Sequence, residues 1–589
     1  MKENALRLSL IQDNPITGDI ENNCKMAKDA ILAERSADLV VFSECFVTGY
    51  PVNDLVLRPG FINAVTDAIA DLRKFVIETN GPAVLIGAPQ VGAPLPYNAA
   101  YLIEPDGNMR VVRKCELPNS DVFDERRTFA MGNPADAKPL MFRGFSLGVQ
   151  ICEDMWHGPV TRALAEENAD LLLVINGSPY NRGKQAVRLK NAETRVRMSG
   201  LPLIYVNQVG GQDELVFDGK SFIMNVNGGV MTAAGFRPDV LRVEVTRGDG
   251  FDKTDNTVMI HGVDEFSADT PRAPLIEDYS ACVLGLRDYV RKIGTSRVFL
   301  GVSGGLDSAL VLAMAVDALG PDRVVGVMMP SRHTGQESLN LADDLMTRLG
   351  VHKMTLPIFD TYDVLNDTMT AVSDGLGEQL GVTPNHGIAR ENYQARLRGV
   401  SLMGLANALG GIVLSTGNKS EMAVGYATLY GDMAGGFNPL KSVYKSDAFE
   451  MSRLRNGLTA EDLGELGFSA VREPIPVRII TRPPTAELAD GQTDQKSLGS
   501  YDVLDTLLRC IIEDSMGPDA GAKRLRQVFG DVDNGPETAG LSFEAYAVMI
   551  AKKVRNAQYK RMQAPPGVKT NLVDFGLGWR YAIAGTYTL

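Results

Sequence analysis

Three side chains that together suit amide hydrolysis follow short apolar runs in the first half of the chain. Glu44 follows ADLVVFS, Lys114 lies within VVRKCELP, and Cys152 follows FSLGVQI. A cysteine can attack an amide carbonyl, a carboxylate can take the thiol proton and return it to ammonia, and an ammonium can stabilise the oxyanion. The three residues therefore indicate an amidase site, although a lone cysteine at a strand end is more often a small buried hydrophobe.

Two acids, Glu153 and Asp154, directly follow Cys152. A nearby carboxylate opposes thiolate formation and raises the pKa of a thiol. Neighbouring side chains at a strand end point in different directions, so neither acid has to face the sulfur. Lys114 could oppose the charge that Glu44 brings. We therefore expect any activation of Cys152 to come from residues elsewhere in the chain.

The stretch VFLGVSGGLDSAL, residues 298–310, has the pattern of an apolar strand, a glycine-rich loop and an apolar helix. Backbone N–H groups of such a loop, with the helix start behind it, can bind phosphate. No lysine follows the loop, so it is not the GxxxxGK[ST] motif, and it does not fit GxGxxG. A plain strand–turn–helix is the alternative, but it would need fewer special residues.

A second polar stretch, LSTGNKSEMAVGYATLYGDMAGGFNPLKSVYK at 414–445, follows another apolar run. It places Thr416 and Glu421 after a predicted strand. The Glu421 carboxylate could complete a Mg²⁺ site with Asp307 of the glycine-rich loop, because Mg²⁺ prefers oxygen ligands. The alternative is an acid on a solvated helix face.

The sequence predicts two α/β domains that position these residues. Residues 1–265 alternate apolar strands (LRLSLIQ, ADLVVFSE, PAVLIGAPQ, NAAYLIE, FSLGVQIC, ADLLLVINGS, PLIYVNQ and KSFIMNV) with helical stretches, which predicts a layered α/β domain. Residues 266–275, FSADTPRAPL, lose periodicity and are predicted to be a linker. From 276 to 589, a helix near 278–293 and the strands RVFLGVS, RVVGVMMP and GGIVLST predict a doubly wound parallel sheet.

Composition limits the possible partners and compartment. The 589 residues carry a net charge of −13, which argues against broad binding to nucleic acid or membranes. No window approaches a membrane span, and MKENALRLSLIQD lacks a secretion signal. The six cysteines are scattered and form neither a disulfide framework nor a zinc pattern. We expect a cytoplasmic protein.

The blocks FSECFVTGY, KCELPN, FDERRTF and ICEDMW resemble, in order, those of the nitrilase superfamily. This resemblance implies an α-β-β-α layered domain whose triad is Glu44, Lys114 and Cys152, with Glu125 as a supporting carboxylate near the lysine. NGSPY, the GK pair at 183–184 and GLPLIYVNQVGGQDELVFDG are similar to the glutaminase branch. The implied glutamine-binding residues are Ser178, Lys184 and Ser120, the last at a position where the family commonly has tyrosine.

SGGLDS resembles the pyrophosphate-binding loop of the N-type ATP pyrophosphatases. The resemblance implies an ATP-binding loop that also supplies Asp307 to Mg²⁺, made of Gly301, Ser303, Gly304, Gly305, Leu306, Asp307 and Ser308. The 414–445 stretch, RENYQARLRG and YKRMQAPPGVK resemble the NAD synthetase branch. They imply that Thr416 and Lys445 contact ATP and that Glu421 binds metal. The implied deamido-NAD⁺-binding residues are Asn392, Glu421, Asp432 and Lys560, although Lys560 could equally lie on a solvated helix face.

Nearly the whole chain thus resembles the glutamine-dependent NAD⁺ synthetases. The resemblance implies that deamido-NAD⁺, ATP and glutamine become NAD⁺, AMP, pyrophosphate and glutamate, in a homo-oligomer. It also implies a thioester at Cys152, a sheltered passage of ammonia and an adenylated nicotinate carboxylate. Three alternatives stay open: an amidotransferase with another acceptor, an amidase carrying an inactive nucleotide module, and a non-enzymatic ATP sensor.

Overall fold

The computed structural model describes residues 5–247, 258–262, 272–483, 495–530, 534–576 and 578–584. The chain divides into two compact units, Met1–Arg272 and Ala273–Leu589. Most of the predicted linker at 266–275 lies outside the described residues. Its last two residues, Pro274 and Leu275, already belong to helix α5 (Pro274–Lys292), because proline is well suited to a first helical turn.

Two sheets form the centre of the first unit, as far as it is described. One sheet has the strand order β15 (Val258–Gly262), β14 (Asp239–Arg247), β1 (Ala5–Gln12), β2 (Leu39–Val41), β3 (Ala83–Gln90), β4 (Tyr97–Ile103), β5 (Met109–Arg113). The other has the order β13 (Val230–Thr232), β12 (Phe222–Met224), β9 (Leu203–Asn207), β8 (Leu171–Asn176), β7 (Phe145–Ile151), β6 (Leu140–Phe142). In each sheet three neighbouring strands, β1–β2–β3 and β7–β8–β9, run parallel.

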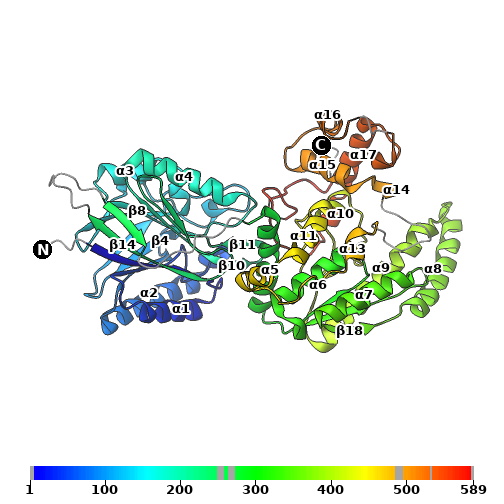
Figure 1. Ribbon diagram of the computed structural model, residues 1–589, viewed down its shortest axis with the longest axis horizontal. Helices are drawn as coiled ribbons and strands as arrows, with labels where there is room; N and C mark the ends of the chain where they lie inside the picture. Colours follow the sequence, from blue (N-terminus) through cyan, green and yellow to red (C-terminus); the bar gives the residue numbers. More distant parts are fainter. Residues whose placement is uncertain are drawn as a thin grey trace. The chain divides into compact units, whose positions relative to one another are not determined.

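Helices cover the outer face of each sheet (Figure 1). α1 (Ile20–Ala33) and α2 (Pro59–Thr79) pack on the first sheet, and α3 (Pro159–Glu166) and α4 (Lys184–Ser199) pack on the second. A third apolar core, which includes Leu10, Val149 and Leu173, fills the space between the sheets. The parallel strands are buried on both faces, which explains their continuous apolar runs. The predicted α-β-β-α layers are confirmed.

The second unit is built on a parallel sheet with the order β18 (His352–Thr355), β17 (Val324–Met328), β16 (Val298–Gly301), β19 (Ile412–Val413). The chain steps outward from β16 to β18 through α6 (Leu306–Leu319) and α7 (Gln336–Leu349). It returns to β19 through α8 (Phe359–Leu380) and α9 (His386–Leu409). Crossover connections between parallel strands are right-handed, so two pairs of helices that connect strands in opposite directions lie on opposite faces of the sheet. The predicted doubly wound sheet is therefore confirmed. The strand order reverses between β16 and β19, where such folds bind ligands.

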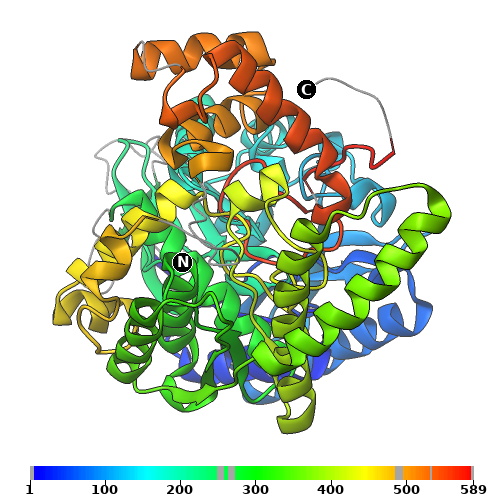
Figure 2. The same cartoon turned by 90° about the vertical axis from the view of Figure 1, so that its right-hand side faces the viewer.

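The remaining helices extend the second unit. α8 and α9 lie side by side (Figures 1 and 2), and α15 (Tyr501–Ile512), α16 (Pro518–Phe529) and α17 (Phe543–Asn556) pack around a separate apolar core. The shorter helices are α10 (Lys419–Val424), α11 (Lys445–Gly457), α12 (Ala460–Leu466), α13 (Val477–Thr481), α14 (Gln495–Leu498) and α18 (Gln558–Arg561). Among the described helices, none has the length and apolar character needed to cross a bilayer.

Candidate active sites

A buried ion cluster joins Glu44, Lys114 and Glu125. Lys114 Nζ donates to Glu44 Oε1 at 2.7 Å and to both carboxylate oxygens of Glu125 at 2.9 Å. Tyr50 donates its hydroxyl to Glu125 Oε1 at 2.7 Å. The side chains of Glu44 and Lys114 are fully buried. A buried charge is costly unless an opposite charge and hydrogen bonds compensate it. Lys114 provides both to Glu44 and to Glu125, and the two carboxylates provide them to Lys114.

Cys152 begins a 3₁₀ turn, η4 (Cys152–Met155), directly after β7. Its φ is 47°, a left-handed conformation that costs energy for a non-glycine residue and often marks a functional site. Asp154 does not act on the sulfur by hydrogen bonding. Its carboxylate instead accepts the backbone N–H groups of Ile151, Cys115 and Glu116 at 2.8–3.0 Å, which ties the Cys152 turn to the segment that carries Lys114.

The charges around Cys152 set its proton affinity. Burial raises the pKa of the Cys152 thiol well above its ordinary value, the Glu44 carboxylate raises it further, and Lys114 opposes this rise. Burial alone would lower the pKa of Lys114, but the charges of Glu125 and Glu44 outweigh burial and hold it well above its ordinary value. At neutral pH the lysine is therefore an ammonium and the cysteine a thiol, so the sulfur needs a base before it can attack.

The three residues implied to bind glutamine lie in different surroundings. Ser178 is buried and follows β8, and Lys184 opens α4 with its Nζ 4.3 Å from the centre of the Trp156 ring. Burial lowers the pKa of Lys184, and the positive charge of Arg188 lowers it further. Ser120 is exposed, and its carbonyl accepts the N–H of Phe123 at 3.0 Å.

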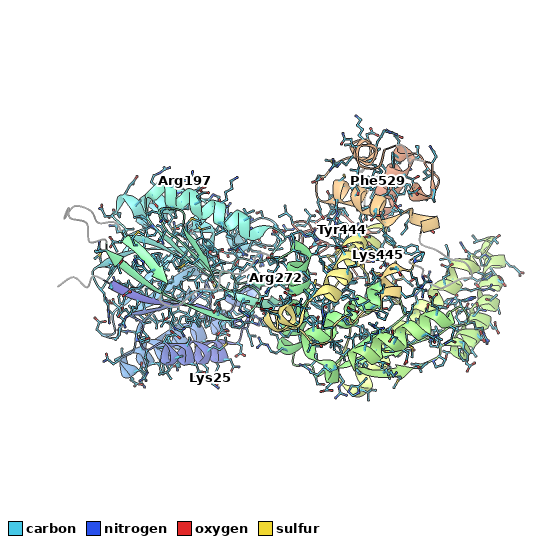
Figure 3. The ribbon with its side chains drawn as sticks, in the orientation of Figure 1. Lys25, Arg197, Arg272, Tyr444, Lys445 and Phe529 are labelled. Carbon is cyan, nitrogen blue, oxygen red and sulfur yellow. The ribbon has the colours of Figure 1, made fainter. Side chains whose placement is uncertain are left out.

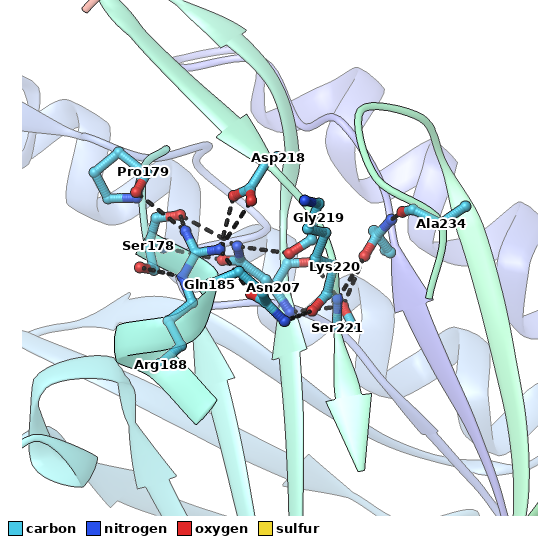
Figure 4. Close-up of polar contacts among 11 residues, drawn as sticks. Ser178, Pro179, Gln185, Arg188, Asn207, Asp218, Gly219, Lys220, Ser221 and Ala234 are labelled. Atoms are coloured by element: carbon cyan, nitrogen blue, oxygen red, sulfur yellow. Dashed lines mark hydrogen bonds and ion pairs between the residues drawn. The ribbon is translucent and has the colours of Figure 1, made fainter. Parts of the chain in front are cut away.

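Figure 4 shows a polar network behind Ser178 that the sequence did not indicate. Arg188, fully buried on α4, donates to Asp218 at 2.8 and 3.0 Å, to Ser178 Oγ at 3.1 Å and to the Ser178 carbonyl at 2.8 Å. Asn207 binds both the N–H and the carbonyl of Ser178. These contacts fix the segment after β8 and the orientation of the Ser178 hydroxyl.

Replacing Arg188 with methionine is expected to destabilise the first unit by about 3–5 kcal/mol, because Asp218 would remain as an unpaired buried charge. Urea unfolding followed by Trp156 fluorescence measures this, in a Trp579→Phe background that makes the signal specific to the first unit. Arg197→Met is the matched control, since Arg197 is 77% exposed on the same helix (Figure 3) and should cost less than about 0.5 kcal/mol. Equal losses in the two variants would contradict this account.

A cavity of about 310 Å³ opens where the strand order of the second unit reverses. All seven predicted loop residues, 301 and 303–308, line it, as do Thr416, Glu421, Asp432 and Lys445. Gly304 has φ 78°, and a Cβ there would lie 2.3 Å from the carbonyl oxygen of Ser338. The loop can therefore approach α7 this closely only with glycine at that position.

Lys445 lies between the two carboxylates of the predicted metal site. Its Nζ contacts Asp307 Oδ2 in a short ion pair and is 3.8 Å from Glu421 Oε1. Lys445 is the first residue of α11 and directly follows Tyr444 (both labelled in Figure 3). Asp307 Oδ1 is buried and accepts no hydrogen bond from the described residues. Two carboxylates, one with an unsatisfied buried oxygen, are a donor set that suits Mg²⁺.

Asn392 and Lys560 lie behind residues that line the cavity. Asn392 Oδ1 accepts the hydroxyl of Thr428, a lining residue, at 2.7 Å. Lys560 Nζ donates to the carbonyls of Gly425 and Ala427, both at 2.7 Å, so it stabilises the C-terminal end of α10 instead of pointing from a solvated helix face. Thr428 also donates its N–H to Asp432 at 2.6 Å. The structure thus links these three predicted residues through the segment after α10.

Two lining arginines had not been predicted. Arg398 on α9 and Arg482 after α13 both border the cavity. Arg398 lies in the RENYQARLRG stretch, which was a usable signal, whereas nothing in the sequence around Arg482 distinguishes it. Positive charge at this edge suits a site for phosphates.

Family models match both units. A carbon-nitrogen hydrolase model matches residues 7–250, and an NAD synthase model matches residues 278–529. Fold and site therefore define a carbon–nitrogen hydrolase domain joined to an NAD synthase domain. Two curated relatives named glutamine-dependent NAD(+) synthetase, from Rhodobacter capsulatus and Thermotoga maritima, are 41% and 37% identical; the alignments cover 99% of this chain and 98% and 99% of theirs. The chain belongs to the glutamine-dependent NAD(+) synthetase family and is an enzyme of the ligase class.

Solved structures agree with this assignment. The glutamine-dependent NAD⁺ synthetase of Acinetobacter baumannii, solved in complex with ADP, is 34% identical and aligns with a TM-score of 0.71 over 98% of both chains. A glutamine-dependent NAD(+) synthetase from Cytophaga hutchinsonii, at 20% identity and a TM-score of 0.73, shows the same fold over 99% of this chain and 98% of its own.

Proposed function

We propose that the protein converts deamido-NAD⁺ to NAD⁺ with glutamine as nitrogen donor, while ATP is cleaved to AMP and pyrophosphate. One observation carries the proposal: a single chain holds both a buried Glu44–Lys114 ion pair, whose charges act on Cys152, and a glycine-rich loop on a cavity, in the domain order of the family. An amidase alone releases ammonia as waste, and the second unit needs a nitrogen nucleophile. Joined, they form an amidotransferase.

In the first half-reaction, Glu44 takes the proton of the Cys152 thiol as the sulfur attacks the side-chain amide of glutamine. Lys114 stabilises the oxyanion, because its ammonium is held in a water-poor site where charge interactions are strong. Glu44 then returns the proton to the departing ammonia, which leaves a thioester at Cys152. A water molecule, deprotonated by Glu44, releases glutamate. Ser178, Lys184 and the segment at Ser120 would hold the substrate.

In the second half-reaction, the nicotinate carboxylate attacks the α-phosphate of ATP and pyrophosphate leaves. The N–H groups of residues 303–308 and Lys445 would bind the phosphates, and Thr416 would contact ATP. Asp307 and Glu421 would hold Mg²⁺, which when bound offsets charge on the phosphates. Asn392, Asp432 and Lys560 would order the segment that contacts deamido-NAD⁺. Ammonia then displaces AMP, and transfer within the protein would keep it unprotonated. A cytoplasmic location and a homo-oligomer remain predictions.

The test is to follow NAD⁺ formation from deamido-NAD⁺ and Mg-ATP, with glutamine or ammonium chloride as nitrogen source. We expect one AMP, one pyrophosphate and, with glutamine, one glutamate per NAD⁺. Turnover of another carboxylate acceptor in place of deamido-NAD⁺ would favour the amidotransferase alternative. Hydrolysis of simple amides without ATP, and no NAD⁺ from either source, would favour the amidase alternative. Nucleotide binding without pyrophosphate release would favour the sensor.

A further inference from the structure

The carboxylate of Glu44 accepts hydrogen bonds unevenly at its two oxygens. Oε1 accepts Nδ2 of Asn98 and Nζ of Lys114, both at 2.7 Å, whereas Oε2 accepts the N–H of Gly177 at 2.8 Å. A carboxylate oxygen offers two lone-pair sites. Oε1 is therefore fully occupied by these contacts, and Oε2 keeps one site at which a proton can arrive.

Asn98 is fully buried on β4 and connects both charged members of the triad. Its side chain reaches Glu44, and its backbone carbonyl accepts the N–H of Lys114 at 2.8 Å. The carboxylate can only accept, so the amide nitrogen of Asn98 must face Glu44 and the amide oxygen must face away.

The amide oxygen of Asn98 meets the thiol of Cys45, with 3.5 Å between Oδ1 and Sγ. Cys45 is fully buried, and burial, together with the charges of Glu44 and Glu125, raises its pKa well above the ordinary value. Cys45 therefore keeps its proton and donates it to Asn98 Oδ1. A chain of two hydrogen bonds, from Cys45 to Asn98 and from Asn98 to Glu44, fixes the amide in one orientation.

We propose that Asn98, oriented by Cys45, is a positioning residue of the glutaminase half-reaction that holds the Glu44 carboxylate in place and directs the proton of Cys152 to Glu44 Oε2. This inference rests on the proposed function. As the S–C bond forms, the S–H proton moves to Oε2 and the carbonyl electron pair moves to oxygen. As the C–N bond breaks, the Oε2 proton goes to the leaving nitrogen as ammonia. In hydrolysis, water gives a proton to Oε2, and the thiol regains it.

The first test is the kinetics of glutamine-driven NAD⁺ synthesis in Asn98→Ala. Without the amide N–H, the Glu44 carboxylate loses a charge-assisted hydrogen bond that fixes which of its oxygens can receive the thiol proton. At pH 7.5 we expect kcat to fall about 10–100-fold and KM for glutamine to stay within about threefold. NAD⁺ formation from ammonium chloride is the internal reference, because that reaction does not use the triad.

The Cys45 variants test the orienting step and remain informative if Asn98→Ala does not fold. Cys45→Ala removes the donor to Asn98 Oδ1 and should lower glutamine-driven kcat by about 3–10-fold, with KM for glutamine within about threefold. Cys45→Ser restores a donor of nearly the same size and should keep kcat within about twofold of the unsubstituted protein. The two substitutions share the backbone conformation of Cys45, φ 47°, so strain does not separate them.

An unchanged glutamine-driven kcat in Asn98→Ala, or an equal fall with ammonium chloride, would overturn the proposal, because neither result indicates a role in the glutaminase half-reaction. Equal values of kcat in Cys45→Ala and Cys45→Ser would overturn the orienting step. Absence of glutamine-driven NAD⁺ synthesis in the unsubstituted protein is a separate result, since it would contradict the proposed function before any variant is compared.

Discussion

Cys152→Ala is expected to lower glutamine-driven NAD⁺ synthesis by at least about a thousandfold, while synthesis from ammonium chloride stays within about twofold of the unsubstituted protein. Without the sulfur no thioester forms, and loss of a nucleophile leaves only the contribution of substrate binding and charge stabilisation. The ammonia-driven reaction needs only the second unit's cavity. The measurement is NAD⁺ formation with each nitrogen source, together with glutamate release.

Cys24→Ala is the matched control for this variant. Cys24 is a buried thiol of the same unit, on α1, outside the ion cluster. Its removal should leave both nitrogen sources effective, so a general effect of losing a buried sulfur would be recognised. Retention of glutamine-driven synthesis in Cys152→Ala would exclude Cys152 as the nucleophile.

Asp307→Asn is expected to lower NAD⁺ synthesis about 10²–10³-fold with either nitrogen source. The variant loses a carboxylate of the proposed metal site and the ion pair with Lys445. Basal glutamine hydrolysis should persist, because Glu44, Lys114 and Cys152 are unchanged. Pyrophosphate release measures the adenylation step, and glutamate release measures the first half-reaction.

Asp322→Asn provides the comparison for Asp307→Asn. Asp322 is exposed in a 3₁₀ turn between α6 and β17 and does not line the cavity. Both substitutions remove one negative charge from the same unit, so a change in net charge alone would affect them equally. If Asp307→Asn kept more than a tenth of the activity, the assignment of Asp307 to the phosphate and metal site would be wrong.

Many strand positions were predictable from the sequence, because those strands are continuous apolar runs. All eight predicted strands of the first unit and all three of the second are present. β18 was not predicted, because HKMT is exposed at all four positions on a sheet edge and has no apolar pattern. The glycine-rich loop was predictable because its φ values and close contacts restrict which residues can occupy it.

Buried polar residues outside the motifs were not predictable. In KQAVRLKNAETRVRMS, Arg188 has the sequence surroundings of a solvated helix face, and only the fold brings Asp218 to it from β11 (Leu215–Asp218). Asn98 lies in an apolar strand run, where one amide carries no signal of its own. Such residues depend on contacts that are 30 to 54 positions distant in sequence.

The position of Lys445 between Asp307 and Glu421 makes its ammonium the counter-ion of both carboxylates before any substrate arrives. A nucleotide alone would draw the lysine to its phosphates and take its positive charge away from both carboxylates, and a divalent cation alone would displace the lysine without giving it a new anion. Either exchange is costly in a site that is largely shielded from water. Arriving together, nucleotide and cation exchange partners so that the lysine and the carboxylates each keep an opposite charge nearby, which implies that the binding of each strengthens the binding of the other by the same factor.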